Sequence, residues 1–138
     1  MPATSNAFDD LLVLARSARE QAYAPYSNFL VGAALLTRDG RSFSGCNVEN
    51  ASYGLCNCAE RTALFNAIAA GYRPGDFAAL AVIADTDNPV SPCGACRQVM
   101  AELCDDAMPV LLANLRGDTQ QTTVAALLPG SFKLPQSA

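Results

Sequence analysis

The 138-residue chain is long enough for one domain with its own core, and its 51% hydrophobic and 16% charged residues are typical of a globular protein rather than a disordered one. A formal net charge of −4 without a basic run argues against nucleic acid as the main partner. Because the chain has no histidine, Ser-His and Cys-His catalysis are excluded, and any transition metal must be held largely by thiolates.

The N-terminus carries no export signal, which would have a positively charged start and an apolar core of about 7–15 residues. No apolar run approaches the roughly 20 residues that a membrane span needs. We therefore expect a soluble, cytoplasmic protein without a membrane partner.

Apolar residues at helical spacing over 8–22 predict an amphipathic helix that ends near Pro25. Thr4, Ser5 or Asn6 is available as its N-cap.

A β-hairpin is predicted next. Residues 29–37 and 41–48 are rich in β-branched and aromatic side chains and flank the turn signal at 38–40. Gly32 and Gly45 interrupt these strands, where glycine often marks a bulge or the close approach of another group to the backbone.

The second half of the chain alternates helices and strands. The elements predicted there are a helix from Cys58 closed by Gly71, a buried strand at 77–84, a helix at 93–104, a buried strand at 109–113, an edge strand near 119, and a short helix from Thr123. Ala63, Ala67 and Ala70 would let the first of these helices lie close on a sheet. The recurring strand-helix-strand pattern predicts parallel neighbours joined by right-handed crossovers.

Three cysteines and a glutamate carry the chemistry that the sequence suggests. Cys93 and Cys96 have the Cys-x-x-Cys spacing at a predicted helix start, which puts two thiols on one face of the first turn. Cys58 starts the other helix, and the positive end of a helix lowers a thiol pKa. Glu60 shares a cavity with Cys58 only if Cys58 stands at the helix start, as predicted.

Three thiolates with an open fourth position are typical of catalytic zinc, whereas four thiolates make a closed structural site. Two alternatives remain at this point: Cys56 as a fourth ligand, and a disulfide between Cys93 and Cys96. Glu60 either exchanges protons as a general acid and base, or is an ordinary first-turn carboxylate favoured by the helix dipole.

Two arginines directly follow motif residues. Three thiolates on a zinc dication sum to a charge of −1, which must be offset if the site is to activate water. Arg61 and Arg97 either donate hydrogen bonds to the thiolate sulfurs or form surface salt bridges.

These residues match the three-cysteine variant of the signature of zinc-dependent nucleobase deaminases, in which a ligand two residues before a glutamate is followed by Pro-Cys-x-x-Cys. From about Ala22 to Phe132 the chain resembles the small homotetrameric cytidine deaminases. Five segments carry the resemblance: 29–35, 45–51, 58–63, 92–98 and 127–132. It implies an α/β fold, in which residues 1–138 form one cytidine deaminase-like domain with three α-β-α layers and a mixed five-stranded sheet of an antiparallel hairpin plus parallel strands.

The same resemblance implies an activity: hydrolytic deamination of free cytidine and deoxycytidine to uridine and deoxyuridine, with release of ammonia, in pyrimidine salvage. One zinc ion per chain would lie on Cys58, Cys93 and Cys96. Glu60 would move protons between the attacking water and the ring.

Substrate contacts are also implied by the resemblance. Asn47 and Glu49 would bind the ribose hydroxyls, Phe29 would pack on the nucleoside, and the backbone near Ala59 would meet the pyrimidine edge. Without the resemblance, Phe29 is an ordinary strand core residue, and the polar pair is an ordinary strand end.

The resemblance also implies a homotetramer with shared active sites, in which Phe132 and Tyr53 would enter the pocket from neighbouring subunits. Taken alone, Phe132 would be a hydrophobic plug on the domain surface. Three rival functions stay open at this point: deamination of another small cytosine compound such as a blasticidin-type antibiotic, a non-catalytic zinc-stabilised binding module, and editing of RNA or DNA, which the acidic balance disfavours.

Overall fold

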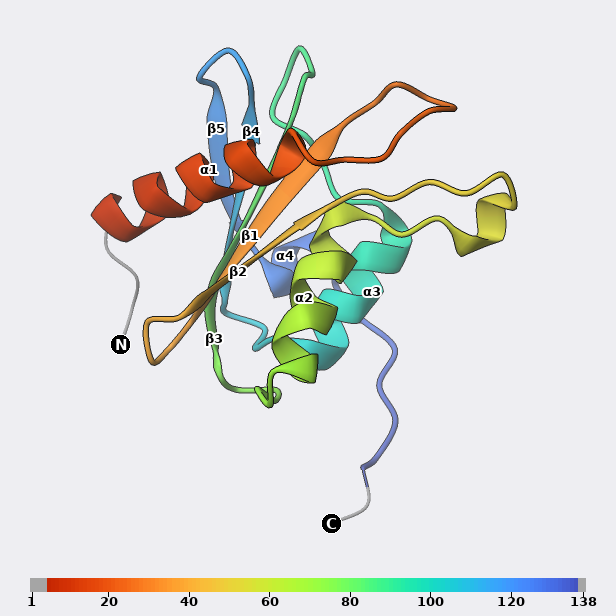
Figure 1. The fold of residues 1–138 in the computed structure, drawn as a ribbon. Helices are drawn as coiled ribbons and strands as arrows, with labels where there is room; N and C mark the ends of the chain where they lie inside the picture. Colours follow the sequence, from red (N-terminus) through yellow and green to blue (C-terminus); the bar gives the residue numbers. More distant parts are fainter. Residues whose placement is uncertain (1–4, 137–138) are drawn as a thin grey trace.

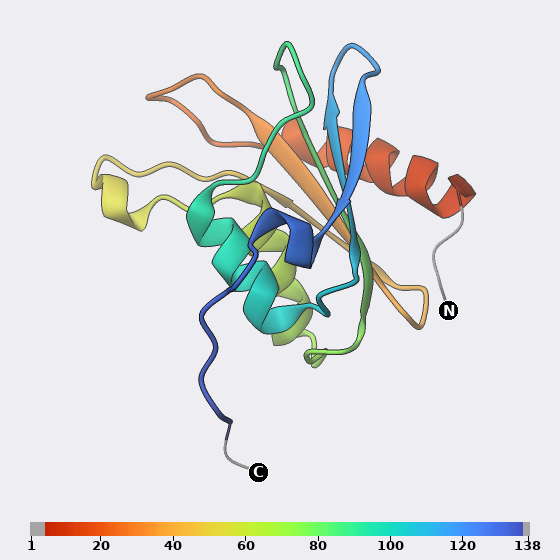
Figure 2. The same cartoon turned by 180° about the vertical axis from the view of Figure 1, so that it is seen from behind.

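The computed structural model of the chain describes residues 5–136. Its elements are α1 (Ser5–Arg19), β1 (Val31–Thr37), β2 (Ser42–Cys46), the 3-10 turn η1 (Tyr53–Leu55), α2 (Ala59–Ala69), β3 (Phe77–Ala84), α3 (Gly94–Leu103), β4 (Pro109–Asn114), β5 (Thr119–Thr123) and α4 (Val124–Leu127). One sheet has the strand order β2-β1-β3-β4-β5. Helix α1 covers one face, and α2, α3 and α4 cover the other (Figures 1 and 2). The predicted three-layer fold with a mixed sheet is confirmed.

The strand order corrects one expectation, namely that each strand-helix-strand unit joins two neighbouring parallel strands. Strands β3 and β4 pair in parallel, whereas β1 pairs antiparallel with both β2 and β3, and β5 pairs antiparallel with β4. The unit β3-α3-β4 therefore joins parallel neighbours as predicted. Strands β2 and β3 also run the same way, but they are not neighbours, because the hairpin partner β1 lies between them.

The two strand glycines mark where helices lie directly on the sheet. A Cβ atom on Gly32 would stand 2.0 Å from the carbonyl oxygen of Ala15 in α1. On Gly45 it would stand 2.5 Å from the carbonyl oxygen of Ala59 in α2. Helices on opposite faces thus approach the sheet backbone closer than any larger residue allows, and the predicted close approach is confirmed at both positions.

Two apolar cores fill the spaces between the layers. The larger lies between the sheet and α2 with α3, and the smaller lies under α1. Strand β3 contributes to both, since Leu80 and Val82 face the larger core while Ala81 and Ile83 face the smaller. Its continuous apolar run follows from this two-sided burial, and each fully buried Leu, Val or Ile side chain contributes about 1.5–3 kcal/mol. Within residues 5–136 no helix combines the length and apolar character needed to cross a membrane.

Element boundaries differ from the predictions where the chain bonds to distant segments. Helix α1 ends at Arg19 rather than near Pro25, because the following residues pair with another loop: Tyr23 N donates to Asn47 O at 3.0 Å. The first strand starts at Val31 rather than 29, and the second ends at Cys46 rather than 48. Ala70 follows α2 and is exposed, so it does not lie close on the sheet as predicted. Gly71 ends the helix with φ 103°, as predicted. Because α1 begins at Ser5, the N-cap candidate Thr4 lies outside the described residues.

Candidate metal centre and active site

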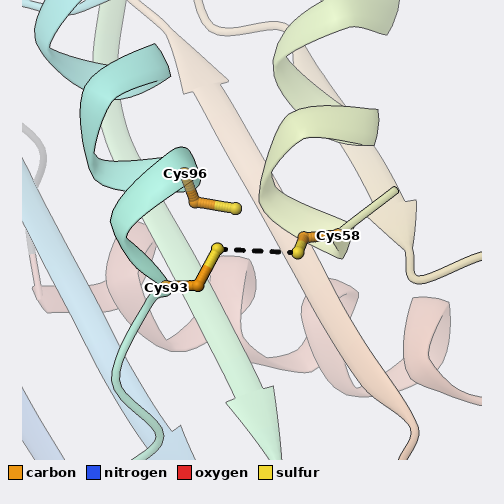
Figure 3. A group of neighbouring side chains, drawn as sticks. All are labelled: Cys58, Cys93 and Cys96. Atoms are coloured by element: carbon orange, nitrogen blue, oxygen red, sulfur yellow. Dashed lines mark hydrogen bonds between the residues drawn. The ribbon is translucent and has the colours of Figure 1, made fainter. Parts of the chain in front are cut away.

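The thiols of Cys58, Cys93 and Cys96 point toward one another from the starts of two neighbouring helices (Figure 3). Cys58 is the N-cap residue of α2, and Cys93 is the N-cap residue of α3, with Cys96 in the first turn. The Cys58 and Cys93 sulfurs are 3.8 Å apart, and all three lie within 4.8 Å of one another. Among residues 5–136 this is the one such group of possible metal ligands.

The cluster fits a thiolate-bound metal ion. Zinc–sulfur bonds of about 2.3 Å in tetrahedral geometry set sulfurs about 3.8 Å apart, and the three sulfurs, all within 4.8 Å of one another, are close to that spacing. Cys56 is not a fourth ligand, because its Sγ accepts a hydrogen bond from Asn50 N at 3.3 Å, outside the group. All six cysteines are free, so the alternative of a Cys93–Cys96 disulfide is not observed. Three ligands leave the fourth position open.

The environment of the cluster favours thiolate at Cys58. Hydrogen bonding to Cys96 and to the Arg61 guanidinium lowers the Cys58 pKa to about 5, against the burial of the thiol. The same interaction with Cys58, together with burial, raises the pKa of Cys96. These interactions favour a Cys58 thiolate that accepts a hydrogen bond from the Cys96 thiol, and a bound cation would take the place of that proton. Arg61 Nη2 donates to Cys58 Sγ at 3.3 Å, as expected for a residue that withdraws charge from the sulfur.

The expectation for Arg97 needs correcting. Its guanidinium donates to Pro92 O at 2.8 Å, to Leu127 O at 2.8 Å and to Ser91 Oγ, and none of its hydrogen bonds reaches a sulfur. Two of these acceptors are backbone carbonyl groups, one in the loop before α3 and one in α4, whereas the prediction placed the hydrogen bonds of Arg97 on the sulfurs. Arg97 therefore ties the loop before α3 to the end of α4.

Glu60 stands in the first turn of α2 and is only 4% exposed. Burial raises the pKa of its carboxyl group, and the neighbouring Cys58 thiolate adds to the effect. A carboxyl group that holds its proton more strongly than in water has the property required of a general acid near neutral pH. The arrangement is the one predicted, since Cys58 ends the extended segment and Glu60 follows within the helix.

A pocket of about 180 Å³ joins the cluster to the predicted substrate residues. Its lining comprises Phe29, Val31, Asn47, Cys58, Ala59, Glu60, Val90, Ser91 and Cys93. Phe29, Asn47 and Ala59 were predicted here. Val31, Val90 and Ser91 were not predicted as site residues, and the only signal for the last two was their position just before the Pro92 of the motif. The polar atoms of Asn47 hold the chain nearby: Oδ1 accepts from Val31 N, and Nδ2 donates to Phe29 O, both at 2.8 Å.

Three of the predicted substrate residues lie outside this pocket. Glu49 and Tyr53 line a second hollow of about 300 Å³ together with Tyr26, Ser27 and Cys56. Tyr53 is 75% exposed and Phe132 is 68% exposed. The backbone of Phe132 is held by α3, since Gln98 Nε2 donates to its carbonyl oxygen at 2.9 Å. Within one chain, these two aromatic side chains do not line the pocket that contains Glu60.

Comparison with known proteins decides the family. Residues 6–112 match the family described as "Cytidine and deoxycytidylate deaminase zinc-binding region". The chain belongs to this family. The three-cysteine centre is accordingly a zinc site, with one ion per chain.

Proteins similar in sequence to this chain include two bacterial proteins named cytidine deaminase. The one from Sporosarcina psychrophila is 60% identical over 124 residues, covering 90% of this chain and 90% of that protein. The one from Halalkalibacterium halodurans is 62% identical over 122 residues, covering 88% and 91%. A crystal structure of cytidine deaminase from Burkholderia pseudomallei superimposes with a TM-score of 0.89 at 62% identity, covering 94% of this chain and all of that one.

Proposed function

We propose that this family member is a zinc-dependent cytidine deaminase, which hydrolyses free cytidine and deoxycytidine to uridine and deoxyuridine with release of ammonia. The observation that carries the proposal is the buried Glu60 carboxyl beside three converging cysteines in a pocket. Relatives that bear the name cytidine deaminase, at 60% and 62% identity over about nine tenths of the chain, support the substrate class.

The chain's residues divide the chemistry among them. Zinc held by Cys58, Cys93 and Cys96 would supply the Lewis acidity that makes water a nucleophile at neutral pH. Glu60 accepts the proton that water loses and delivers it to the ring nitrogen of cytosine. Water adds its oxygen to the amino-bearing ring carbon, and Glu60 then carries the proton of the new hydroxyl group to the amino group. The carbon–nitrogen bond breaks as the ring carbonyl forms, and ammonia leaves. Arg61 withdraws charge from the Cys58 sulfur and thereby offsets the negative charge of the site.

Nucleoside recognition is assigned to the strand and loop residues around the pocket. Asn47 and Glu49 bind sugar hydroxyls, Phe29 packs on the nucleoside, and the Ala59 backbone meets the pyrimidine edge. In support, Phe29, Asn47 and Ala59 line the pocket with Glu60. A closed zinc site, as in a non-catalytic binding module, would need Cys56 as its fourth ligand. Cys56 lies outside the cluster, which argues against that alternative.

Metal content and ultraviolet absorbance test the function directly. We expect one zinc ion per purified chain, and an absorbance change on addition of cytidine or deoxycytidine as each is converted to its uracil product. Zinc at that level without conversion of either nucleoside would refute the proposed activity and would leave a binding module in its place.

We further propose a homotetramer with shared active sites. The pocket around Glu60, about 180 Å³, is smaller than the roughly 300–1,000 Å³ of ordinary ligand pockets, and walls supplied by a neighbouring chain would extend it. Tyr53 and Phe132 are large aromatic side chains left exposed in the single chain. In the assembly both would enter a neighbouring subunit's pocket.

Subunit mixing tests the sharing. Glu60→Gln lacks the proton carrier, and Phe132→Ala lacks the residue lent to a neighbour, so each variant alone should be strongly impaired. After the two are mixed and reassembled, some sites combine an intact Glu60 with an intact Phe132 from the other chain, and we expect activity above the sum of the separate variants. Light scattering checks the tetramer, and activity that stays at that sum would contradict shared sites.

Two broader proposals accompany the function. The site needs reduced thiols, and the cytosol keeps thiols reduced, which supports a cytoplasmic location. A single sheet carries both cores, which supports the assignment of residues 1–138 to one domain.

A further inference from the structure

The loop between α1 and β1 holds the Glu49 carboxylate with three donors. Tyr26 N and Ser27 N donate to Oε1 at 2.9 and 3.1 Å, and the Ser27 hydroxyl donates to Oε2. The same hydroxyl oxygen accepts a hydrogen bond from Phe29 N at 3.0 Å. One atom of Ser27 thus joins the carboxylate assigned to the sugar with the residue assigned to pack on the nucleoside.

This double role depends on hydroxyl chemistry. A hydroxyl carries one proton and two lone pairs, so donation to Glu49 leaves the oxygen free to accept from Phe29 N. The backbone between Ser27 and Phe29 turns so that Phe29 N reaches the Ser27 hydroxyl, because Asn28 adopts φ 56° and its N–H donates to Ala24 O at 2.9 Å. Asparagine is among the few residues that adopt this left-handed conformation readily.

Without these hydrogen bonds, the Glu49 carboxylate would have no fixed orientation before substrate binds. It borders an open hollow, where a glutamate side chain is free to change rotamer and loses that freedom only when substrate binds. Three of its roughly four acceptor positions are filled by the loop, which leaves an oriented acceptor for one more donor. The Ser27 hydrogen bond is also the main cause that lowers the Glu49 pKa, so the group stays ionised and accepts only.

We propose that Ser27 is a positioning residue for nucleoside binding, whose hydroxyl orients the Glu49 carboxylate toward a sugar hydroxyl and fixes the Phe29 backbone beside it. The inference rests on the proposed function. Ser27 itself touches neither zinc nor the reacting carbon, and therefore acts on affinity rather than on the chemical step.

The test compares Ser27→Ala with Ser27→Thr, which keeps a hydroxyl, and with Ser17→Ala, a matched control on exposed α1 across the sheet from the cysteines. For cytidine we expect Ser27→Ala to raise KM roughly three- to tenfold, with kcat changed by less than about twofold. Ser27→Thr should restore most of the affinity, and the control should match wild type. Calorimetric Kd values for cytidine in a Glu60→Gln background should rise in parallel.

A nucleoside without the 2′ and 3′ sugar hydroxyls separates positioning from general damage. With 2′,3′-dideoxycytidine, Ser27→Ala should have little further effect, because the oriented acceptor has no 2′ or 3′ hydroxyl donor to bind. An unchanged KM for cytidine, or an equal rise with both nucleosides, overturns the inference. If Ser27→Ala does not fold, Ser27→Cys replaces it with the same expectations. Failure of wild type to convert cytidine instead overturns the proposed function, which is measured first.

Discussion

Glu60→Gln is expected to lower kcat for cytidine roughly 100- to 10,000-fold while zinc content and fold remain those of wild type. Glutamine has nearly the shape of glutamate, so the first turn of α2 and the pocket wall should be preserved. The amide neither accepts the proton of the attacking water nor delivers one to the ring nitrogen. Steady-state kinetics, zinc analysis and thermal unfolding of the same preparation check the three parts of the expectation.

Glu20→Gln provides the matched control, because the same chemical change is made on an exposed side chain directly after α1. It should leave kcat, KM and zinc content unchanged. Activity close to wild type in Glu60→Gln would remove Glu60 from proton transfer, and the buried carboxyl would then have only a structural task. Loss of zinc in that variant would mean that the carboxyl supports the metal centre rather than the chemistry.

The metal centre was predictable because its determinants are local. The spacing of Cys93 and Cys96, and the start of a helix at Cys58, follow from a few neighbouring residues and from helix geometry. The glycines were partly predictable for a similar reason: Gly32 and Gly45 interrupt strands where glycine marks a bulge or a close approach, and the structure shows the close approach at both. The position of Glu60 then followed from that of Cys58.

Contacts between distant segments were not predictable. Arg97 directly follows a zinc ligand, yet its partners are the Ser91 hydroxyl and two carbonyls, one of them 30 residues away at Leu127. Ser27 carries no motif, and its bond to Glu49 spans 22 residues. The early end of α1 has the same cause, because backbone bonds to the loop after β2 replace the helical ones. Hydrogen bonds between distant segments determine these features, and a single sequence does not show which distant groups will meet.

Cys96→Ala is expected to abolish zinc retention and activity and to lower the thermal stability of the folded chain. Cys96 is fully buried, so solvent cannot easily replace its sulfur as a ligand. At free zinc about 100 times above its Kd, binding stabilises the folded state by about 2.7 kcal/mol, and the variant loses that contribution. Zinc analysis and thermal unfolding with and without a chelator measure both effects. The chelator should destabilise wild type and leave Cys96→Ala unchanged.

Cys104→Ala separates loss of a ligand from loss of packing. Cys104 closes the same helix at 6% exposure, and burial raises its pKa to about 12, so it is a neutral core thiol. Its removal should cost about 1 kcal/mol through the cavity it leaves, yet zinc content and the response to chelator should stay as in wild type. Equal zinc loss in both variants would show that zinc retention reports core packing, whereas zinc retained in Cys96→Ala would exclude this sulfur as a ligand.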